Sequence, residues 1–98
     1  MIRHTVVFRL KAPKHSSEER EFLRAAGELA AIPGVGNFVC LRQVNPKSPF
    51  DYCLSMEFAS QEDYQGYNRH PAHTQFVSGR WNPEVTAYVE LDYELMHS

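Results

Sequence analysis

Residues 2–10 read Ile2-Arg3-His4-Thr5-Val6-Val7-Phe8-Arg9-Leu10, and their alternation decides the fold of this 98-residue chain. The side chains at even positions, which include His4, Val6 and Phe8, fall on one face of an extended backbone. Arg3, Thr5, Val7 and Arg9 fall on the other. A period of two is typical of a β-strand, so the chain is predicted to open with a strand that carries a histidine on its apolar face.

A helix is predicted next. Ser16 followed by Glu19 is typical of a capping box, and the helix should run to about Ile32, where Pro33-Gly34 ends it. Its apolar face is formed at helical spacing by Phe22, Leu23, Ala26, Leu29 and Ala30. Residues 38–44 and 52–58 are then predicted as two strands of an antiparallel hairpin, since the two prolines between them are typical of a turn.

In the second half of the chain, the sequence again predicts a helical segment followed by a strand. Ser60 with Asp63 predicts the start of a second helix. Pro71 breaks or restarts it, because proline suits a first helical position, and a short helix should run through Phe76. Residues 81–83 are expected to be a connection. The alternation of residues 85–95 predicts a long last strand.

The order β-α-β-β-α-β predicts an α+β fold of the ferredoxin-like kind, in which a four-stranded antiparallel sheet carries both helices on one face. Residues 1–98 are expected to form a single domain. Val7, Val39 and Leu41 lie opposite core residues, on the face that the helices leave uncovered. An apolar sheet face of this kind favours a second subunit, so we expect a homodimer that forms a dimeric α+β barrel.

Composition excludes several classes of partner. The net charge is −2 and no basic run occurs, which argues against nucleic acid. No apolar run approaches the ~20 residues of a membrane span, and the first residues lack the features of a signal peptide. We therefore expect a cytoplasmic protein, with Cys40 and Cys53 as reduced thiols.

The segment Tyr67-Asn68-Arg69-His70-Pro71-Ala72-His73 places one phenol and two imidazoles within seven residues. Imidazole titrates near neutral pH, and a buried histidine or tyrosine needs a partner for its polar end. With His4 on the first strand, the segment is either the wall of a pocket capable of acid–base chemistry or a satisfied polar seam in the core. The helix-facing positions Val6, Phe8, Phe22 and Phe76 are predicted to line the same pocket.

Five segments in chain order carry a family resemblance: residues 4–8, 32–35, 58–60, the pattern Tyr67-x-x-His70-Pro71-x-His73-x-x-Phe76, and Asp92-Tyr93. On these residues the chain resembles the stress-responsive A/B barrel domain (Dabb) family of the dimeric α+β barrel superfamily. The resemblance implies a homodimer with a small-molecule cavity between sheet and helices in each subunit. Most members have no assigned activity.

Some plant relatives resemble polyketide cyclases, which close a ring by aldol chemistry without a metal or organic cofactor. The resemblance implies that His73 is the general base and Tyr67 the group that holds or polarises the substrate. It places His4 and His70 near the pocket. The position at which the cyclases carry a further pocket tyrosine is Ala26 or Gly27 here, so one polar wall group is absent.

Two function classes stay open from the sequence. The first is a cofactor-free enzyme or carrier for a small apolar carbonyl compound, in which a neutral imidazole removes a proton and a phenol donates to the developing oxyanion. The second is a non-catalytic dimer with a structural or stress-related role. A cofactor-independent monooxygenase is a related enzyme option, for which the oxygen chemistry would have to come from the substrate. No metal site is expected, because no carboxylate stands at ligand spacing beside His4, His70 and His73.

Two further groups of residues are predicted to face solvent. Glu90, Asp92 and Glu94 alternate on one face of the last strand, which is typical of a solvated face, with Arg9 or Arg42 as pairing partners. His15 and His97 fall in segments expected to be exposed.

Overall fold

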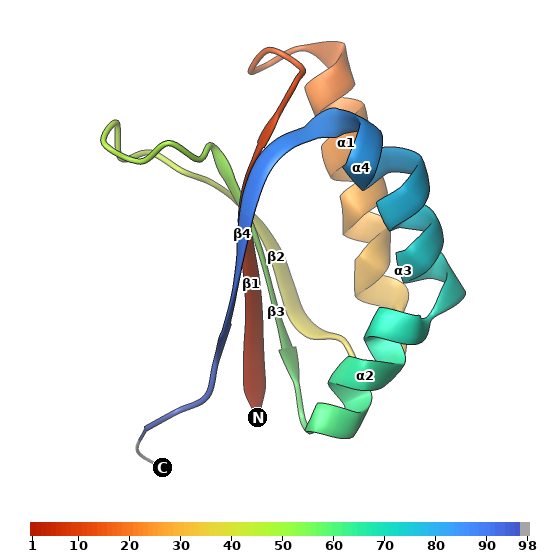
Figure 1. The fold of residues 1–98 in the computed structure, drawn as a ribbon. Helices are drawn as coiled ribbons and strands as arrows, with labels where there is room; N and C mark the ends of the chain where they lie inside the picture. Colours follow the sequence, from red (N-terminus) through yellow and green to blue (C-terminus); the bar gives the residue numbers. More distant parts are fainter. Residues whose placement is uncertain (97–98) are drawn as a thin grey trace.

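A four-stranded antiparallel sheet carries the helices on one of its two faces (Figure 1). The computed structural model describes residues 1–96, so His97 lies outside the described residues. In chain order the elements are β1 (Ile2–Leu10), α1 (Ser17–Gly27), the 3₁₀ turn η1 (Glu28–Ala31), β2 (Gly36–Arg42), β3 (Tyr52–Phe58), α2 (Gln61–Arg69), α3 (Pro71–Phe76), the π-helical η2 (Val77–Trp81), α4 (Asn82–Glu84) and β4 (Val85–Tyr93). The predicted ferredoxin-like α+β fold is confirmed.

The first strand lies inside the sheet, whose strand order is β2-β3-β1-β4. β1 pairs with β3 on one side and with β4 on the other, both antiparallel, and His4 stands opposite Met56 and Asp92. Along β1 the buried positions are His4, Val6 and Phe8, as the alternation predicted. The strand histidine therefore faces the helices.

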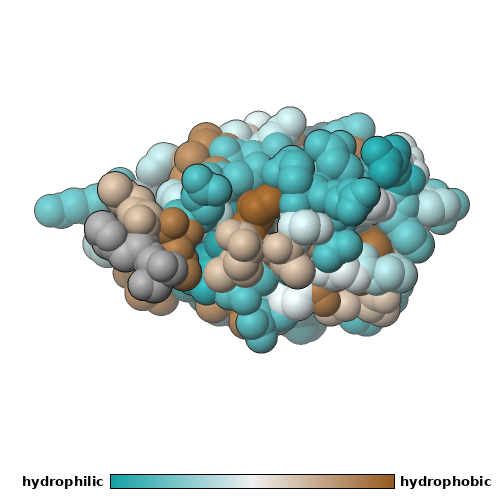
Figure 2. All heavy atoms as spheres, turned by 90° about the horizontal axis from the view of Figure 1, so that it is seen from below, coloured by the Kyte–Doolittle hydropathy of each residue, from teal (hydrophilic) through white to brown (hydrophobic). Residues whose placement is uncertain are grey.

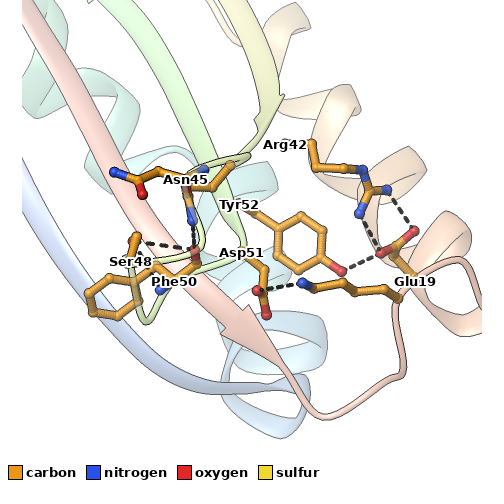
Figure 3. A network of polar contacts seen from close by, with 9 residues as sticks. Glu19, Arg42, Asn45, Ser48, Phe50, Asp51 and Tyr52 are labelled. Carbon is orange, nitrogen blue, oxygen red and sulfur yellow. Dashed lines mark hydrogen bonds and ion pairs between the residues drawn. The ribbon is translucent and has the colours of Figure 1, made fainter.

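The start of α1 uses only half of the predicted capping box. The Ser16 hydroxyl accepts a hydrogen bond from the Glu19 amide at 3.2 Å, but the Ser16 amide donates to the Pro13 carbonyl at 3.2 Å. The Glu19 carboxylate is thus not needed at the cap. It turns toward the sheet, where Arg42 of β2 and Tyr52 of β3 point at it (Figure 3).

This partly buried ion pair ties α1 to the sheet. Glu19 is 2% exposed and accepts from the Arg42 guanidinium at 3.0 and 3.2 Å. The Tyr52 hydroxyl donates to the same carboxylate. The Arg42 hydrogen bonds hold the pKa of Glu19 at about 2, although burial opposes them. Burial and then the Glu19 carboxylate raise the pKa of Tyr52 to about 12. Arg42 is therefore not a partner of the β4 carboxylates within this chain.

The first helix ends earlier than the predicted Ile32. After Gly27 the chain tightens into η1, as the last turns of helices often do. Ile32 is extended, with φ −67° and ψ 133°, because a residue before proline is kept out of the helical region. Pro33 and Gly34 then form a turn closed by the Val35 amide, which donates to the Ile32 carbonyl at 3.2 Å. Gly34 takes φ 91° there, as a type II turn requires.

The second half follows the prediction closely up to Phe76. Ser60 caps α2 by accepting from the Asp63 amide at 3.1 Å, and Pro71 opens α3 as its first residue. The expected connection at residues 81–83 is wrong, since the chain stays helical from Pro71 to Glu84. Trp81 supplies the reason: the residue is only 9% exposed, and its ring lies 4.9 Å, centroid to centroid, from that of Phe8. The outer strands are also shifted, with β2 at residues 36–42 and β4 ending at Tyr93.

An aromatic cluster fills the space between the layers. Phe8 stacks on Tyr52 at 5.3 Å and packs on Phe22 at 5.8 Å, and Phe22 packs on Phe76 at 5.5 Å, all between ring centroids. Aromatic pairs of this kind are worth about 0.5–1.5 kcal/mol beyond the area they bury. The cluster holds α1, α3 and η2 against the sheet.

The surface is mixed in character. In the view from below, hydrophobic side chains reach the surface among hydrophilic ones (Figure 2). Within residues 1–96, no helix has the length and apolar character needed to cross a membrane. His15 is exposed, as predicted.

Candidate functional site

A cavity of about 200 Å³ lies between the sheet and the segment that runs from α2 to α4. Its floor is apolar and comes from β1 and β3. Its wall comes from the helices, and two exposed side chains of β4, Tyr88 and Glu90, stand at its open side. The residues that line it are His4, Val6, Leu29, Leu54, Met56, Tyr67, His73, Phe76, Val77, Trp81, Asn82, Tyr88 and Glu90. An apolar pocket with a few polar groups is the usual form of a small-molecule site.

Tyr67 and His73 meet in this cavity although Pro71 interrupts the helix between them. The break is what brings them together. His70 is extended, with φ −65° and ψ 136°, and its Nδ1 accepts from the Ala72 amide at 3.1 Å, so that it caps α3. The chain turns at this point, and the rings of Tyr67 and His73 lie 4.4 Å apart, centroid to centroid.

The hydrogen bonding of His73 leaves one ring nitrogen free to act as a base. Its Nδ1 lies 3.1 Å from the Asn68 carbonyl oxygen, which can only accept, so Nδ1 carries the hydrogen. Nε2 then holds the lone pair. Burial, followed by the nearby His4 ring, lowers the pKa of His73, against the effect of the Asn68 carbonyl. The imidazole is therefore neutral at pH 7.

The phenol of Tyr67 is a hydrogen-bond donor without a partner among residues 1–96. The residue is 2% exposed, yet its hydroxyl is not among the buried polar atoms that lack a partner, so the oxygen is reached from the cavity. Burial raises the pKa of Tyr67 above its usual range, and the Glu90 carboxylate raises it further. The hydroxyl stays protonated and can donate to a ligand.

His4 is held by two partners behind the cavity. Its Nδ1 lies 2.6 Å from Asp92 Oδ1 and 2.9 Å from the Tyr64 hydroxyl oxygen. The Tyr64 hydroxyl donates to Asp92 Oδ2 at 2.9 Å, so the Nδ1 hydrogen of His4 is shared between the carboxylate and the phenol oxygen. This network leaves Nε2 of His4 without a hydrogen-bond partner among residues 1–96. The ring of His4 lies 6.3 Å from that of Tyr67, centroid to centroid.

Five of the eight predicted site residues line the cavity, namely His4, Val6, Tyr67, His73 and Phe76. The other three lie elsewhere. Phe8 and Phe22 are fully buried in the aromatic cluster, because Trp81 and Tyr52 close around them. His70 faces the first turn of α3 as its cap. Their placement in the pocket is corrected accordingly.

Glu90, Asp92 and Glu94 are exposed, as predicted, but Glu90 and Asp92 also have neighbours on the helix side of the sheet. Asp92 stands opposite His4 and Glu90 opposite Val6, so this carboxylate row faces the helix side. Asp92 pairs with His4, and Glu90 lines the cavity. The only signal for this in the sequence is that Glu90 and Asp92 lie out of phase with the apolar residues of the strand. The face of the sheet on which Glu90 and Asp92 lie depends on the pairing register of β4 with β1, which cannot be read from the sequence.

A metal set is not assembled by the described residues. Within residues 1–96, no three His, Cys, Asp or Glu side chains lie close enough together to hold an ion. The polar lining of the cavity includes the imidazoles of His4 and His73, the phenols of Tyr67 and Tyr88, the Asn82 amide and the Glu90 carboxylate, a set suited to proton transfer.

Several solved structures share this architecture. A Dabb family protein with a ferredoxin-like fold from Mesorhizobium loti is 51% identical, with a TM-score of 0.95, and the match covers 97% of this chain and 96% of that one. A dimeric ferredoxin-like protein of unknown function from Thermobifida fusca is 21% identical, with a TM-score of 0.79 and coverage of 96% and 90%. The hydroxynitrile lyase from Passiflora edulis is 19% identical, with a TM-score of 0.85 and coverage of 99% and 94%.

The last two likenesses show the fold alone, because their identities are low. No match was found among curated proteins. The family model described as the stress responsive A/B barrel domain matches residues 2–95. The chain therefore belongs to the stress-responsive A/B barrel domain family.

Proposed function

We propose that this protein binds a small carbonyl compound in the cavity and acts on it by cofactor-free acid–base chemistry. The observation that carries the proposal is the contact between Tyr67 and His73, whose rings lie 4.4 Å apart on the cavity wall. One is a neutral base with a free Nε2, and the other is a protonated donor without a partner among residues 1–96. A base and an acid side by side in an apolar pocket form the minimum apparatus for enolisation.

The proposed step is the removal of a proton from carbon next to a carbonyl group. Nε2 of His73 takes the proton, the C–H electron pair moves into the new C=C bond, and the carbonyl oxygen becomes an enolate oxygen. The Tyr67 hydroxyl donates to that oxygen as its charge develops. His4, held by Asp92, presents Nε2 to the same space and orients a hydroxyl or water next to the ligand.

A second candidate is a non-catalytic role, and the network of His4, Asp92 and Tyr64 favours it. All three side chains are satisfied by one another, as in a polar seam that serves only to fix the packing of α2 on the sheet. Tyr67 and His73 distinguish the two candidates. A purely structural network would pair the Tyr67 hydroxyl and Nε2 of His73 with protein groups, and both lack a partner among residues 1–96.

The functional unit is proposed to be a homodimer formed through the outer sheet face. Two rows of neighbours cross all four strands on that face: Leu41, Cys53, Val7 and Val89, and then Val39, Ser55, Thr5 and Leu91. Leu41 is 50% exposed and Leu91 43%, and the helices cover only the other face (Figure 1). A largely apolar exposed surface of this kind is typical of a subunit interface.

The test is enzyme-dependent exchange of the methyl protons of acetophenone for deuterium in D₂O, followed by NMR. The wild-type protein should accelerate the exchange, and His73→Ala should lose most of the acceleration, by roughly the 10²–10⁴-fold that such catalysis contributes. Tyr67→Phe should lose a large part while keeping the ring. The control is His15→Asn, which removes an exposed imidazole at φ 68°, where asparagine is tolerated.

Two results would decide against catalysis. Equal exchange by the wild-type protein and by His73→Ala would mean that His73 is not the base. No acceleration by the wild-type protein, with a marked loss of stability in both pocket variants, would favour the non-catalytic dimer.

A further inference from the structure

Glu90 is the one carboxylate among the described residues that line the cavity, and the proposed acid–base step does not use it. It stands on β4 opposite Val6 and lines the same cavity as Tyr67 and His73. The Glu90 charge acts on both Tyr67 and His73. After burial, it is the next cause of the raised pKa of Tyr67. It also opposes the lowering of the pKa of His73. The carboxylate therefore faces the space that a ligand would occupy.

Two other carboxylates of this part of the chain, Asp92 and Glu84, are already paired. Asp92 binds His4 and Tyr64, and Glu84 forms an ion pair with Arg80 at 2.6 Å. By contrast, Glu90 has no hydrogen bond or ion pair with any side chain in the described range 1–96. A carboxylate that is free at the mouth of a pocket attracts cations and hydrogen-bond donors and repels anions.

The size of the cavity limits what can sit beside this carboxylate. Its volume is about 200 Å³, and an apolar cavity of about 150 Å³ is known to hold benzene. One ring with a short substituent fits. The ring would lie on the apolar floor of Leu54 and Met56, and the substituent would reach the open side at Glu90.

We propose that Glu90 sets the charge class of the ligand: a single-ring compound that carries a protonated amine or another hydrogen-bond donor, and not a carboxylate. This inference rests on the proposed small-molecule function of the cavity. The donor of the ligand binds the Glu90 carboxylate, and the apolar body lies against the floor. Anionic acids are excluded by repulsion.

The experiment uses Trp81, the single tryptophan of the chain, which lines the cavity and reports binding by its fluorescence. Benzylamine, benzyl alcohol and benzoate serve as probes of similar size with positive, neutral and negative charge. Each is titrated against the wild-type protein, Glu90→Gln and Glu94→Gln. Glu94 is the matched control, because it is exposed and carries the same charge but lies outside the cavity.

The wild-type protein should bind benzylamine at least about tenfold more tightly than benzoate, which corresponds to 1.4 kcal/mol. Glu90→Gln should reduce that ratio to roughly threefold or less and leave the affinity for benzyl alcohol within about twofold, because a partly exposed charge pair contributes on the order of 1 kcal/mol. Glu94→Gln should keep the wild-type ratio. If the probes bind and the ratio is the same in Glu90→Gln, or if both variants lower it equally, the inference about Glu90 is overturned while the cavity remains a ligand site. If none of the three probes gives a saturable change, the inference fails, and the acetophenone exchange decides separately whether the proposed function stands.

Discussion

The imidazole of His4 and the carboxylate of Asp92 face each other across neighbouring strands, with Nδ1 2.6 Å from Oδ1. They are directly opposite in the register of β1 and β4, and they lie 88 positions apart in the chain. Tyr64 of α2 joins both. The contact thus ties the first strand, the last strand and the second helix at a single point, next to the cavity.

Replacing Asp92 should show, in the free energy of unfolding, that His4, Tyr64 and Asp92 are coupled. Asp92→Asn should lower the free energy of unfolding by about 1–3 kcal/mol, because it replaces one of the two carboxylate oxygens by an NH2 group and so leaves either His4 or Tyr64 without its acceptor. Tyr64→Phe should have a smaller effect, and the double variant should show a coupling energy of roughly 0.5–3 kcal/mol. Urea unfolding measures all three, with Glu94→Gln as the control. Strictly additive effects would contradict the network.

The loss of activity at low pH should report the lowered pKa of His73. A base is active in its neutral form, so the rate is lost as the pH falls through the pKa of the group. Because burial lowers the pKa of His73 below the ordinary 6.5, half of the maximal kcat/KM for acetophenone exchange should be reached below pH 6.5. A midpoint clearly above pH 6.5 would point to a different base.

The ion pair of Glu19 and Arg42 should make the free energy of unfolding depend on pH. The folded pKa of Glu19 is depressed from 4.5 to about 2, so its contribution is fully present above pH 4.5 and is lost as the pH falls toward 2. The contribution is at most about 3 kcal/mol, at 1.36 kcal/mol for each pH unit. The free energy of unfolding, measured in urea between pH 2 and 6, should fall over this window.

Glu19→Gln should remove this part of the pH dependence and lower stability at pH 7 by about 1–3 kcal/mol. Glu18→Gln is the matched control, because Glu18 is the neighbouring residue on the exposed side of α1, and its effect should stay within about 0.5 kcal/mol. If both variants follow the wild-type pH curve, the Glu19 pair does not stabilise the fold.

The outer sheet face should be the dimer interface. Val39→Asp should shift the protein from dimer to monomer in sedimentation velocity at micromolar concentration, because it puts a charge into an apolar contact. The control is Val44→Asp, the same change at a residue that is 87% exposed in the loop after β2. A wild-type protein that sediments as a monomer, or equal behaviour of the two variants, would reject this interface.

The sequence predicted the layers of this fold because each local signal agreed with its tertiary role. β1 alternates, Ser60 caps α2, and Pro71 restarts the helix, and all three rest on backbone rules that do not depend on distant residues. Glu19 shows the limit of that reasoning. As a local signal it completed a capping box, but Arg42 of β2 competed for the same carboxylate.

The candidate site was only partly predictable for a similar reason. His4, Tyr67 and His73 could be assigned because they sit on helix-facing positions or beside a helix break. Glu90 could not, since its face depends on how β4 registers with β1. Phe8 was expected in the pocket because it shares a face with His4. Instead, the helical segment that carries Trp81 packs over Phe8, and no local sequence pattern predicts that contact.

The most direct test of the proposed function is a crystal structure of the protein soaked with acetophenone. The account predicts the ligand in the cavity, with its carbonyl oxygen within hydrogen-bond distance of the Tyr67 hydroxyl and its methyl group next to Nε2 of His73. A ligand bound elsewhere, or in the cavity with its carbonyl group turned away from Tyr67 and His73, would contradict it.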